Sequence, residues 1–160
     1  MPQCVTKYHG NIEYQDEQVF QFPQGLPGFA GQRRFVPVEH PSTRPILFLQ
    51  SLDTPELCFI TLPVLVVNPA YRLAVSEEDL ALLQLPTVRQ PAIGTDVLCL
   101  AILTIQPHCA TTANLLAPVV VNLRNRIAVQ AVATDTSYSH QYPFLEPRQD
   151  REPEEVARCS

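Results

Sequence analysis

The chain of 160 residues contains no tryptophan, a single methionine and only one lysine. Its other ten basic residues are arginines, and only Arg33 and Arg34 are adjacent. A protein that tracks a phosphate backbone needs a stripe or patch of positive charge. This chain instead has a formal net charge of −5. The composition therefore argues against direct nucleic-acid binding.

Long apolar runs are also missing, since none reaches the ~18 residues needed to cross a bilayer. The start, Met1-Pro2-Gln3-Cys4, has neither the basic region nor the apolar region of a secretory leader. Apolar residues make up 46% of the chain and charged residues 17%, which is typical of a globular protein with an ordinary core. We expect a cytoplasmic protein with no membrane association.

Paired cysteine spacings are absent, because the five cysteines are widely separated and form no CxxC motif. Cys58 and Cys99 fall in apolar runs, where a free thiol behaves as a small hydrophobic group. His108-Cys109 is the one close pair of possible metal ligands, and one pair is too little for a zinc site. The same pair is the best sequence candidate for a nucleophilic dyad, but no motif surrounds it. We predict no enzyme, metal or cofactor.

Sixteen prolines and five glycines favour short strands joined by hard turns over long helices. The strongest turn signal is the octapeptide Phe22-Pro23-Gln24-Gly25-Leu26-Pro27-Gly28-Phe29, hereafter the corner. Proline fixes φ and glycine enters positive φ without steric cost, so Leu26-Pro27-Gly28 predicts a type II turn. We expect the aromatic residues around the corner, which are Phe20, Phe22, Phe29 and Phe35, to be buried.

The remaining pattern predicts a mostly β fold, a small antiparallel β-barrel-like single domain with one short helix. A hairpin is expected within residues 4–22, with its turn at 9–11, and Pro37 is expected at a sheet edge or strand end. Further strands are predicted at 35–38, 46–51, 57–62, 64–67, 97–105, 111–122 and 127–132. The domain is expected to span 1–145, and the polar, aromatic-free segment 146–160 is predicted to be a disordered tail.

The single predicted helix covers Ser76 to Leu83. Ser76 is a good N-cap, and Glu77, Glu78 and Asp79 occupy the first turn, where the helix dipole favours acids. Capping alone accounts for carboxylates at this place. They are also the densest acids of the predicted domain, so we expect them to form part of a partner-facing surface.

Several segments, taken in order, resemble the flagellar assembly factor FliW family. They include the corner, Phe48-x-Gln50-Ser51, the Asn68-Pro69-x-Tyr71 segment and a late strand with Gln130. Two further matches are Thr6, Gly10 and Ile12 near the start and the Asn114–Asn122 stretch. The resemblance covers roughly residues 5–145.

The resemblance implies a cytoplasmic partner switch without catalytic activity. Such a protein binds flagellin near its chain ends and binds the translational repressor CsrA away from its RNA face, so that secretion of flagellin frees it to remove CsrA from flagellin messenger RNA. We expect it to be monomeric when free. The predicted partner-binding residues are Glu77, Glu78, Asp79, Asn114 and Gln130.

Other interpretations stay open at this point. The protein could be a dedicated flagellin chaperone that does not oppose CsrA. It could also be a barrel for a small ligand, with Leu98, Leu100 and Ile102 lining a cavity instead of a core. Within the Asn114–Asn122 stretch, the asparagines could simply satisfy turn backbone, with Pro118 marking an edge or bulge.

Overall fold

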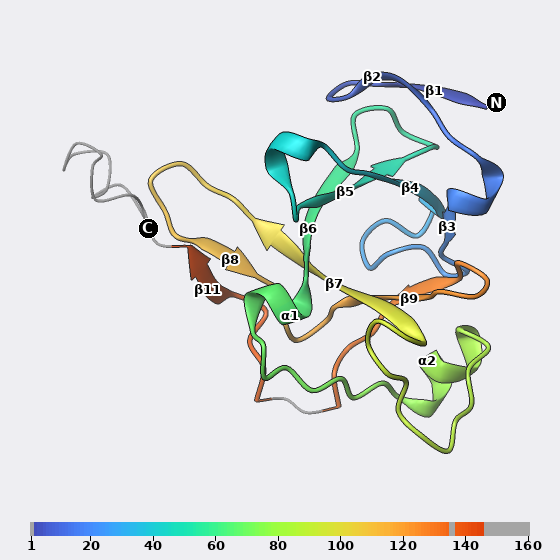
Figure 1. Cartoon of the computed structure of the whole chain (residues 1–160), viewed down its shortest axis with the longest axis vertical. Helices are drawn as coiled ribbons and strands as arrows, with labels where there is room; N and C mark the ends of the chain where they lie inside the picture. The colour runs from blue at the N-terminus through green and yellow to red at the C-terminus, as the bar shows by residue number, and fades with distance from the viewer. Residues whose placement is uncertain (1, 135–136, 146–160) are drawn as a thin grey trace.

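The computed structural model describes residues 2–134 and 137–145, and most of its regular structure is β-strand (Figure 1). The predicted tail at 146–160 lies outside these residues. The strands are β1 (Gln3–Thr6), β2 (Gly10–Glu13), β3 (Phe20–Gln21), β4 (Arg34–Val38), β5 (Leu47–Ser51), β6 (Cys58–Pro63), β7 (Val97–Thr104), β8 (Thr111–Ala113), β9 (Val119–Asn122), β10 (Ala128–Gln130) and β11 (Tyr142–Leu145). The helical turns are η1 (Asp16–Gln18), η2 (Pro41–Thr43), α1 (Val64–Val67) and α2 (Glu77–Leu82).

The main sheet follows the order β10-β9-β7-β6-β5-β4-β3, and neighbouring strands are antiparallel. Its two ends approach each other, because Gln21 on β3 forms an isolated bridge with Ile127 just before β10. The backbone N–H of Gln21 donates to the carbonyl of Arg126 at 3.0 Å. The predicted mostly β, barrel-like class is therefore confirmed, although the sheet curls round without closing.

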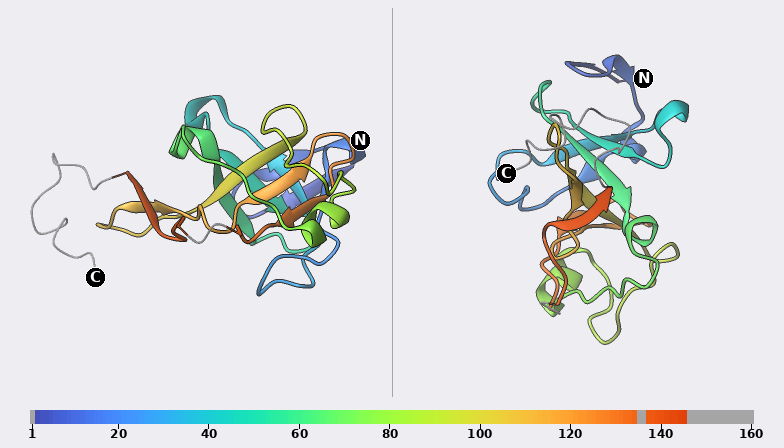
Figure 2. Two further views of the ribbon diagram at one scale, coloured as in Figure 1. Left: turned by 90° about the horizontal axis from the view of Figure 1, so that it is seen from below. Right: turned by 90° about the vertical axis from the view of Figure 1, so that its left-hand side faces the viewer.

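Strand β7 joins this sheet to a second branch. Its first half, residues 97–100, pairs with β9, residues 100–102 pair with β6, and Leu103 and Thr104 at its end pair with β8. Strand β8 in turn pairs with β11. Figure 2 shows this branch projecting from the body of the sheet, while the β1–β2 hairpin forms a separate two-stranded sheet.

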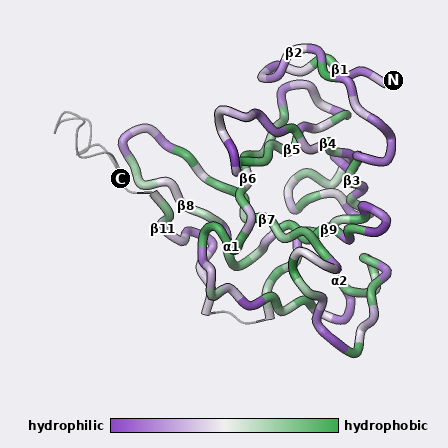
Figure 3. Tube along the Cα trace, in the orientation of Figure 1, coloured by the Kyte–Doolittle hydropathy of each residue, from purple (hydrophilic) through white to green (hydrophobic). Residues whose placement is uncertain are grey.

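Side chains alternate along β7 between two apolar cores, as the period of a strand requires. Cys99 and Ala101 are buried in the core that also contains Leu80 of α2, whereas Leu100 is buried in the core that contains Phe22 and other aromatic residues. Apolar residues colour most of the central strands in Figure 3. Leu100 is fully buried among core side chains, which speaks against its lining an empty ligand cavity.

The predicted strand at 64–67 is wrong, because Val64–Val67 forms the single helical turn α1. The backbone N–H of Asn68 donates to the carbonyl of Val64 at 2.8 Å. Val64 and Val67 are buried, while Leu65 and Val66 between them are about half exposed. A spacing of three places both buried residues on one side of a turn, so burial overrides the strand preference of valine.

Other details also differ from the sequence prediction. The continuous strand expected at 111–122 is split into β8 and β9 by residues 114–118, and the hairpin turn falls at 7–9, two residues early. Strand β11 was not predicted. Strand β4 is not an edge strand, because it lies between β3 and β5. On the β3 side, however, only Arg34 and Phe35 are paired, so Pro37, one residue before the end of β4, has no partner there.

Candidate functional site

The corner consists of two successive turns. The N–H of Gly25 donates to the carbonyl of Phe22 at 3.0 Å, and the N–H of Phe29 donates to the carbonyl of Leu26 at 2.7 Å. Gly28 has a φ of 82°, as the third residue of a type II turn requires, so the predicted turn is confirmed. Phe22 is buried as predicted, but Phe29 is 42% exposed and stacks edge-on against Phe59.

Gly25 holds the corner closed through a close backbone approach. Its φ is +66°, and a Cβ built on it would lie 2.6 Å from the carbonyl oxygen of Ala30. Only glycine combines this conformation with this contact. The octapeptide therefore specifies a fixed shape that a single Pro-Gly turn would not require.

Helix α2 begins as the sequence predicts. The Ser76 hydroxyl accepts a hydrogen bond from the N–H of Asp79 at 3.2 Å, and Glu77 and Glu78 are exposed in the first turn. Burial raises the pKa of the Asp79 carboxyl, the hydrogen bond with the Ser76 side chain opposes this shift, and the nearby Glu78 charge adds to it. Asp79 is thus the acid of this helix that is partly withdrawn from water.

The corner, α2 and β10 meet at a cleft of about 290 Å³, which we name the corner–helix cleft. The corner and β10 both line this cleft, and Asp79 of α2 adds an acidic group. Its lining residues are Gln24, Gly25, Leu26, Pro27, Gly28, Ala30, Asp79, Ala128, Val129 and Gln130. Two of the five predicted partner-binding residues, Asp79 and Gln130, therefore share one site with the strongest turn signal of the sequence.

The other three predicted residues do not line this cleft. Asn114 accepts a hydrogen bond from the N–H of Ala117 at 2.9 Å, and Gln130 donates to the carbonyl of the same Ala117 at 3.0 Å. Asn114 and Gln130 thus both hold the backbone at Ala117. For Asn114 this agrees with the interpretation that the asparagines of this stretch satisfy turn backbone. Glu77 and Glu78 are exposed beside Asp79 on α2.

No sequence pattern indicated that the corner would share a cleft with β10 and α2. The one sequence feature that marked the corner as special was its composition, because two prolines and two glycines within eight residues are more than a simple turn needs. The contact between corner and β10 depends on residues about a hundred positions apart, which no local pattern encodes.

The described residues also bear on metal and membrane chemistry. Within residues 2–134 and 137–145, no three His, Cys, Asp or Glu side chains gather closely enough to hold a metal ion. In the same part of the chain no helix is both long and apolar enough to span a membrane. Cys109 is disulfide-bonded, so the sulfur of the His108-Cys109 pair is not a free nucleophile.

These features define the class: a small antiparallel β protein in which a rigid corner and an acidic helix face one cleft. A crystal structure described as that of the flagellar assembly factor FliW has this fold, with a TM-score of 0.78 and 33% sequence identity. The match covers 90% of this chain and 97% of that chain.

Sequence comparison places the chain more narrowly. The family model described as FliW protein matches residues 3–145, so the chain belongs to the FliW family. The flagellar assembly factor FliW of Bacillus licheniformis is 38% identical over 140 residues, covering 87% of this chain and 94% of that protein. The relative of the same name from Geobacillus sp. strain WCH70 is 36% identical over 155 residues, covering 96% and 98%.

Proposed function

We propose that this protein is a flagellar assembly factor that works in the cytoplasm as a partner switch. It binds flagellin and, when flagellin is scarce, binds the translational repressor CsrA and so restores flagellin translation. It has no catalytic activity of its own and does not contact nucleic acid directly. Membership of the FliW family is the observation that carries this proposal.

The charge of the chain supports the same proposal. A protein that restrains an RNA-binding repressor meets a partner with basic surface, and complementary charge accelerates the encounter. The net charge of −5 and the exposed pair Glu77 and Glu78 suit such an encounter. The scattered arginines give no path for RNA itself.

The corner–helix cleft is the docking surface of this proposal. Asp79 and Gln130 contact the partner directly, since both line the cleft. Glu77 and Glu78 act from the exposed side of α2, through steering and not through burial. Asn114 contributes by holding Ala117, to which Gln130 is also hydrogen-bonded.

A partner switch requires that the two partners exclude each other. One shared surface achieves this most simply, because occupation by one partner then removes the site of the other. Separate sites would instead need an allosteric coupling of about 1–3 kcal/mol. The rigid corner favours the shared surface. Allosteric coupling would need a conformational change that passes from one binding site to the other, and a wall with a fixed backbone changes little.

Charge reversal of Glu77, Glu78 and Asp79 to lysine tests the docking surface. We expect the CsrA association rate to fall by roughly tenfold or more at low salt and its salt dependence to weaken, because steering charges act mainly on association. The control reverses Glu13, Asp16 and Glu17, three exposed acids of the N-terminal segment, with the same change in net charge. Equal effects of both triple variants would show that net charge matters and the cleft does not.

A further inference from the structure

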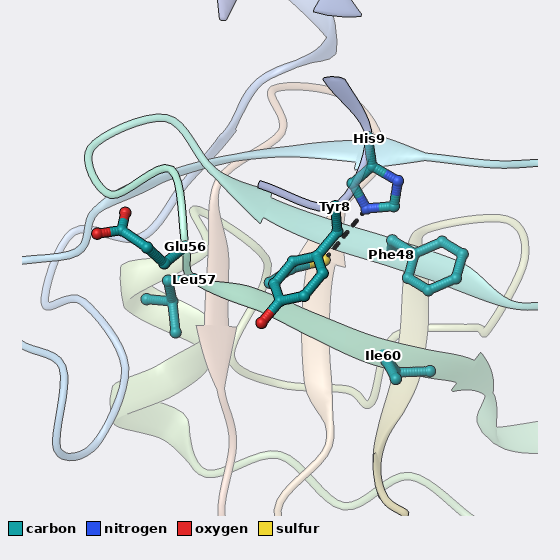
Figure 4. A pocket seen from close by; sticks show the side chains of 7 residues that line it. Tyr8, His9, Phe48, Glu56, Leu57 and Ile60 are labelled. Atoms are coloured by element: carbon teal, nitrogen blue, oxygen red, sulfur yellow. Dashed lines mark hydrogen bonds between the residues drawn. The ribbon is translucent and has the colours of Figure 1, made fainter. Parts of the chain in front are cut away.

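A second cavity, of about 360 Å³, lies between the β1–β2 hairpin and strands β5 and β6. It shares no lining residue with the corner–helix cleft. Figure 4 shows Tyr8 and His9 over the strands, with Phe48 and Ile60 beside them and Glu56 farther along the wall. Most of the lining is apolar or aromatic, and its volume falls in the range of small-ligand pockets.

Two lining residues of this cavity, His9 and Cys58, form a linked chain of titratable side chains with His40, which lies behind His9 and outside the lining. His9 follows β1, His40 precedes η2, and Cys58 begins β6. The Nε2 atom of His9 lies 3.4 Å from Cys58 Sγ, and its Nδ1 atom lies 3.0 Å from His40 Nε2. The dashed line in Figure 4 marks the contact between His9 and the sulfur. A nucleophile, a base and a third group that orients the base thus stand in order.

The pKa shifts assign protons to this chain of groups. Burial raises the pKa of the Cys58 thiol to about 11, so the thiol is protonated at neutral pH. Burial, and secondarily the charge of His40, lowers the pKa of His9, so its imidazole is neutral. The Cys58 sulfur lies 3.4 Å from His9 Nε2 and 3.9 Å from the carbonyl oxygen of Phe59, so we assign the nearer His9 Nε2 as the acceptor of Cys58 Sγ–H and His9 Nδ1–H as the donor to His40 Nε2. The lone pair of His9 Nε2 therefore faces the thiol.

The other free thiols lack these neighbours. Cys99 is 1% exposed within the core, and burial raises the pKa of its thiol to about 12. Cys4 lies on β1, and its sulfur is 3.8 Å from the carbonyl oxygen of Val5. Neither has a histidine contact among the described hydrogen bonds, so the same chain supplies a buried control and a more exposed control.

We propose that Cys58 is a covalent modification site for neutral, apolar electrophiles, with His9 as its base and His40 as a positioning residue. This inference goes beyond the proposed partner switch and does not depend on it. The apolar lining favours an uncharged group, and the Glu56 carboxylate on the same wall disfavours an anionic one. The modification is a single addition and needs no turnover.

The reaction with an activated alkene balances without an oxidant. A bond forms between Cys58 Sγ and the β-carbon of the alkene while the carbon–carbon π bond breaks. The thiol proton passes to His9 Nε2 and then to the α-carbon of the adduct, so no group leaves and His9 returns to its neutral form. His40 keeps the proton of His9 on Nδ1 and so keeps Nε2 free to act.

The test uses the full chain and N-ethylmaleimide, with the rate at each cysteine followed by peptide mass spectrometry. At pH 7 an unassisted thiol of pKa about 11 is ionised to only about one part in ten thousand. With His9 as base, the Cys58 rate instead rises with pH through the lowered pKa of His9 and then levels. We expect His9→Gln to slow Cys58 at least tenfold and leave Cys4 unchanged. His40→Gln should shift the pH profile.

Three results would overturn the proposal. They are a Cys58 rate as slow as that of Cys99, a rate that climbs tenfold per pH unit from pH 6 to 9, and a His9→Gln variant that reacts as fast as or faster than the parent protein. A second comparison tests the electrophile class: iodoacetamide should outpace iodoacetate at Cys58 by a larger factor than at Cys4. Equal factors at both cysteines would contradict selection by the cavity.

Discussion

Replacing Gly25 with alanine tests whether the corner is held by a close backbone approach. The new Cβ would lie 2.6 Å from the carbonyl oxygen and 2.8 Å from the carbonyl carbon of Ala30. Gly28 is the matched control, because it has a similar φ of +82° but no atom within 4 Å of an added Cβ. Both variants replace a glycine of the corner with alanine, so they differ mainly in whether the added Cβ meets the backbone.

The expected magnitudes follow from these contacts. An alanine forced into the left-handed region costs about 1–2 kcal/mol at either position. At Gly25 the overlap with backbone adds the cost of overpacking, about 1–3 kcal/mol. Gly25→Ala should therefore lower the free energy of unfolding by about 2–5 kcal/mol and Gly28→Ala by about 1–2 kcal/mol.

Urea denaturation followed by circular dichroism measures both losses. The dependence of the unfolding free energy on urea should stay unchanged, so that a shift in midpoint reports stability alone. Equal destabilisation by the two substitutions would refute the reasoning, because it would mean that the backbone at Ala30 moves away without cost.

Three further substitutions test individual contacts. Asn122 is 2% exposed and donates to the carbonyl of Leu83 at 2.8 Å, so Asn122→Ala should cost about 2–3 kcal/mol in urea denaturation, against less than about 1 for the exposed Asn125→Ala. A backbone amide and an arginine lower the pKa of Asp96, so Asp96→Asn should be less stable than the parent at pH 7, with the difference lost as pH falls below 3.8. Burial raises the pKa of Asp79, which gives the opposite sign: Asp79→Asn should be the more stable protein at pH 7, and the two stabilities should converge towards pH 3. Thermal melts across pH 2–7 check both aspartates, and parallel curves for parent and variant over that whole range would contradict either assignment.

The features predicted correctly are those that local chemistry determines. A serine followed by three acids specifies the start of α2, and proline followed by glycine specifies the turn at Gly28, whatever the rest of the chain does. The strand predicted at 97–105 likewise follows from a continuous local run of strand-forming residues, and the structure has it as β7. Such patterns were enough for the fold class.

The features missed depend on contacts between distant segments. Val64–Val67 has the composition of a strand, and only its burial against the core makes it a turn of helix. The split between β8 and β9 depends on Asn114 and Gln130, which hold Ala117 from two sides. His9, His40 and Cys58 lie in three separate segments, so sequence spacing pointed to His108 and Cys109 instead.

The structure also gives a role to polar residues that the family resemblance marked without explanation. Gln50 is fully buried, and the two N–H groups of its side-chain amide are shared among the carbonyls of Ser51, Pro55 and Leu57, at 3.0–3.2 Å from Nε2. The Thr6 hydroxyl donates to the carbonyl of Gly10 at 2.8 Å and closes the hairpin turn. Many of the residues that identify the family thus hold its turns, while Asp79 and Gln130 also line the corner–helix cleft.

The central claim is that flagellin and CsrA compete for this protein. Calorimetric titration with each partner, followed by titration of one in the presence of the other, tests it most directly. We expect binding to both partners and an apparent CsrA affinity that falls in proportion to the flagellin present. Simultaneous binding with unchanged affinities would contradict the partner switch. Binding to flagellin alone would contradict it too, and would leave a dedicated flagellin chaperone.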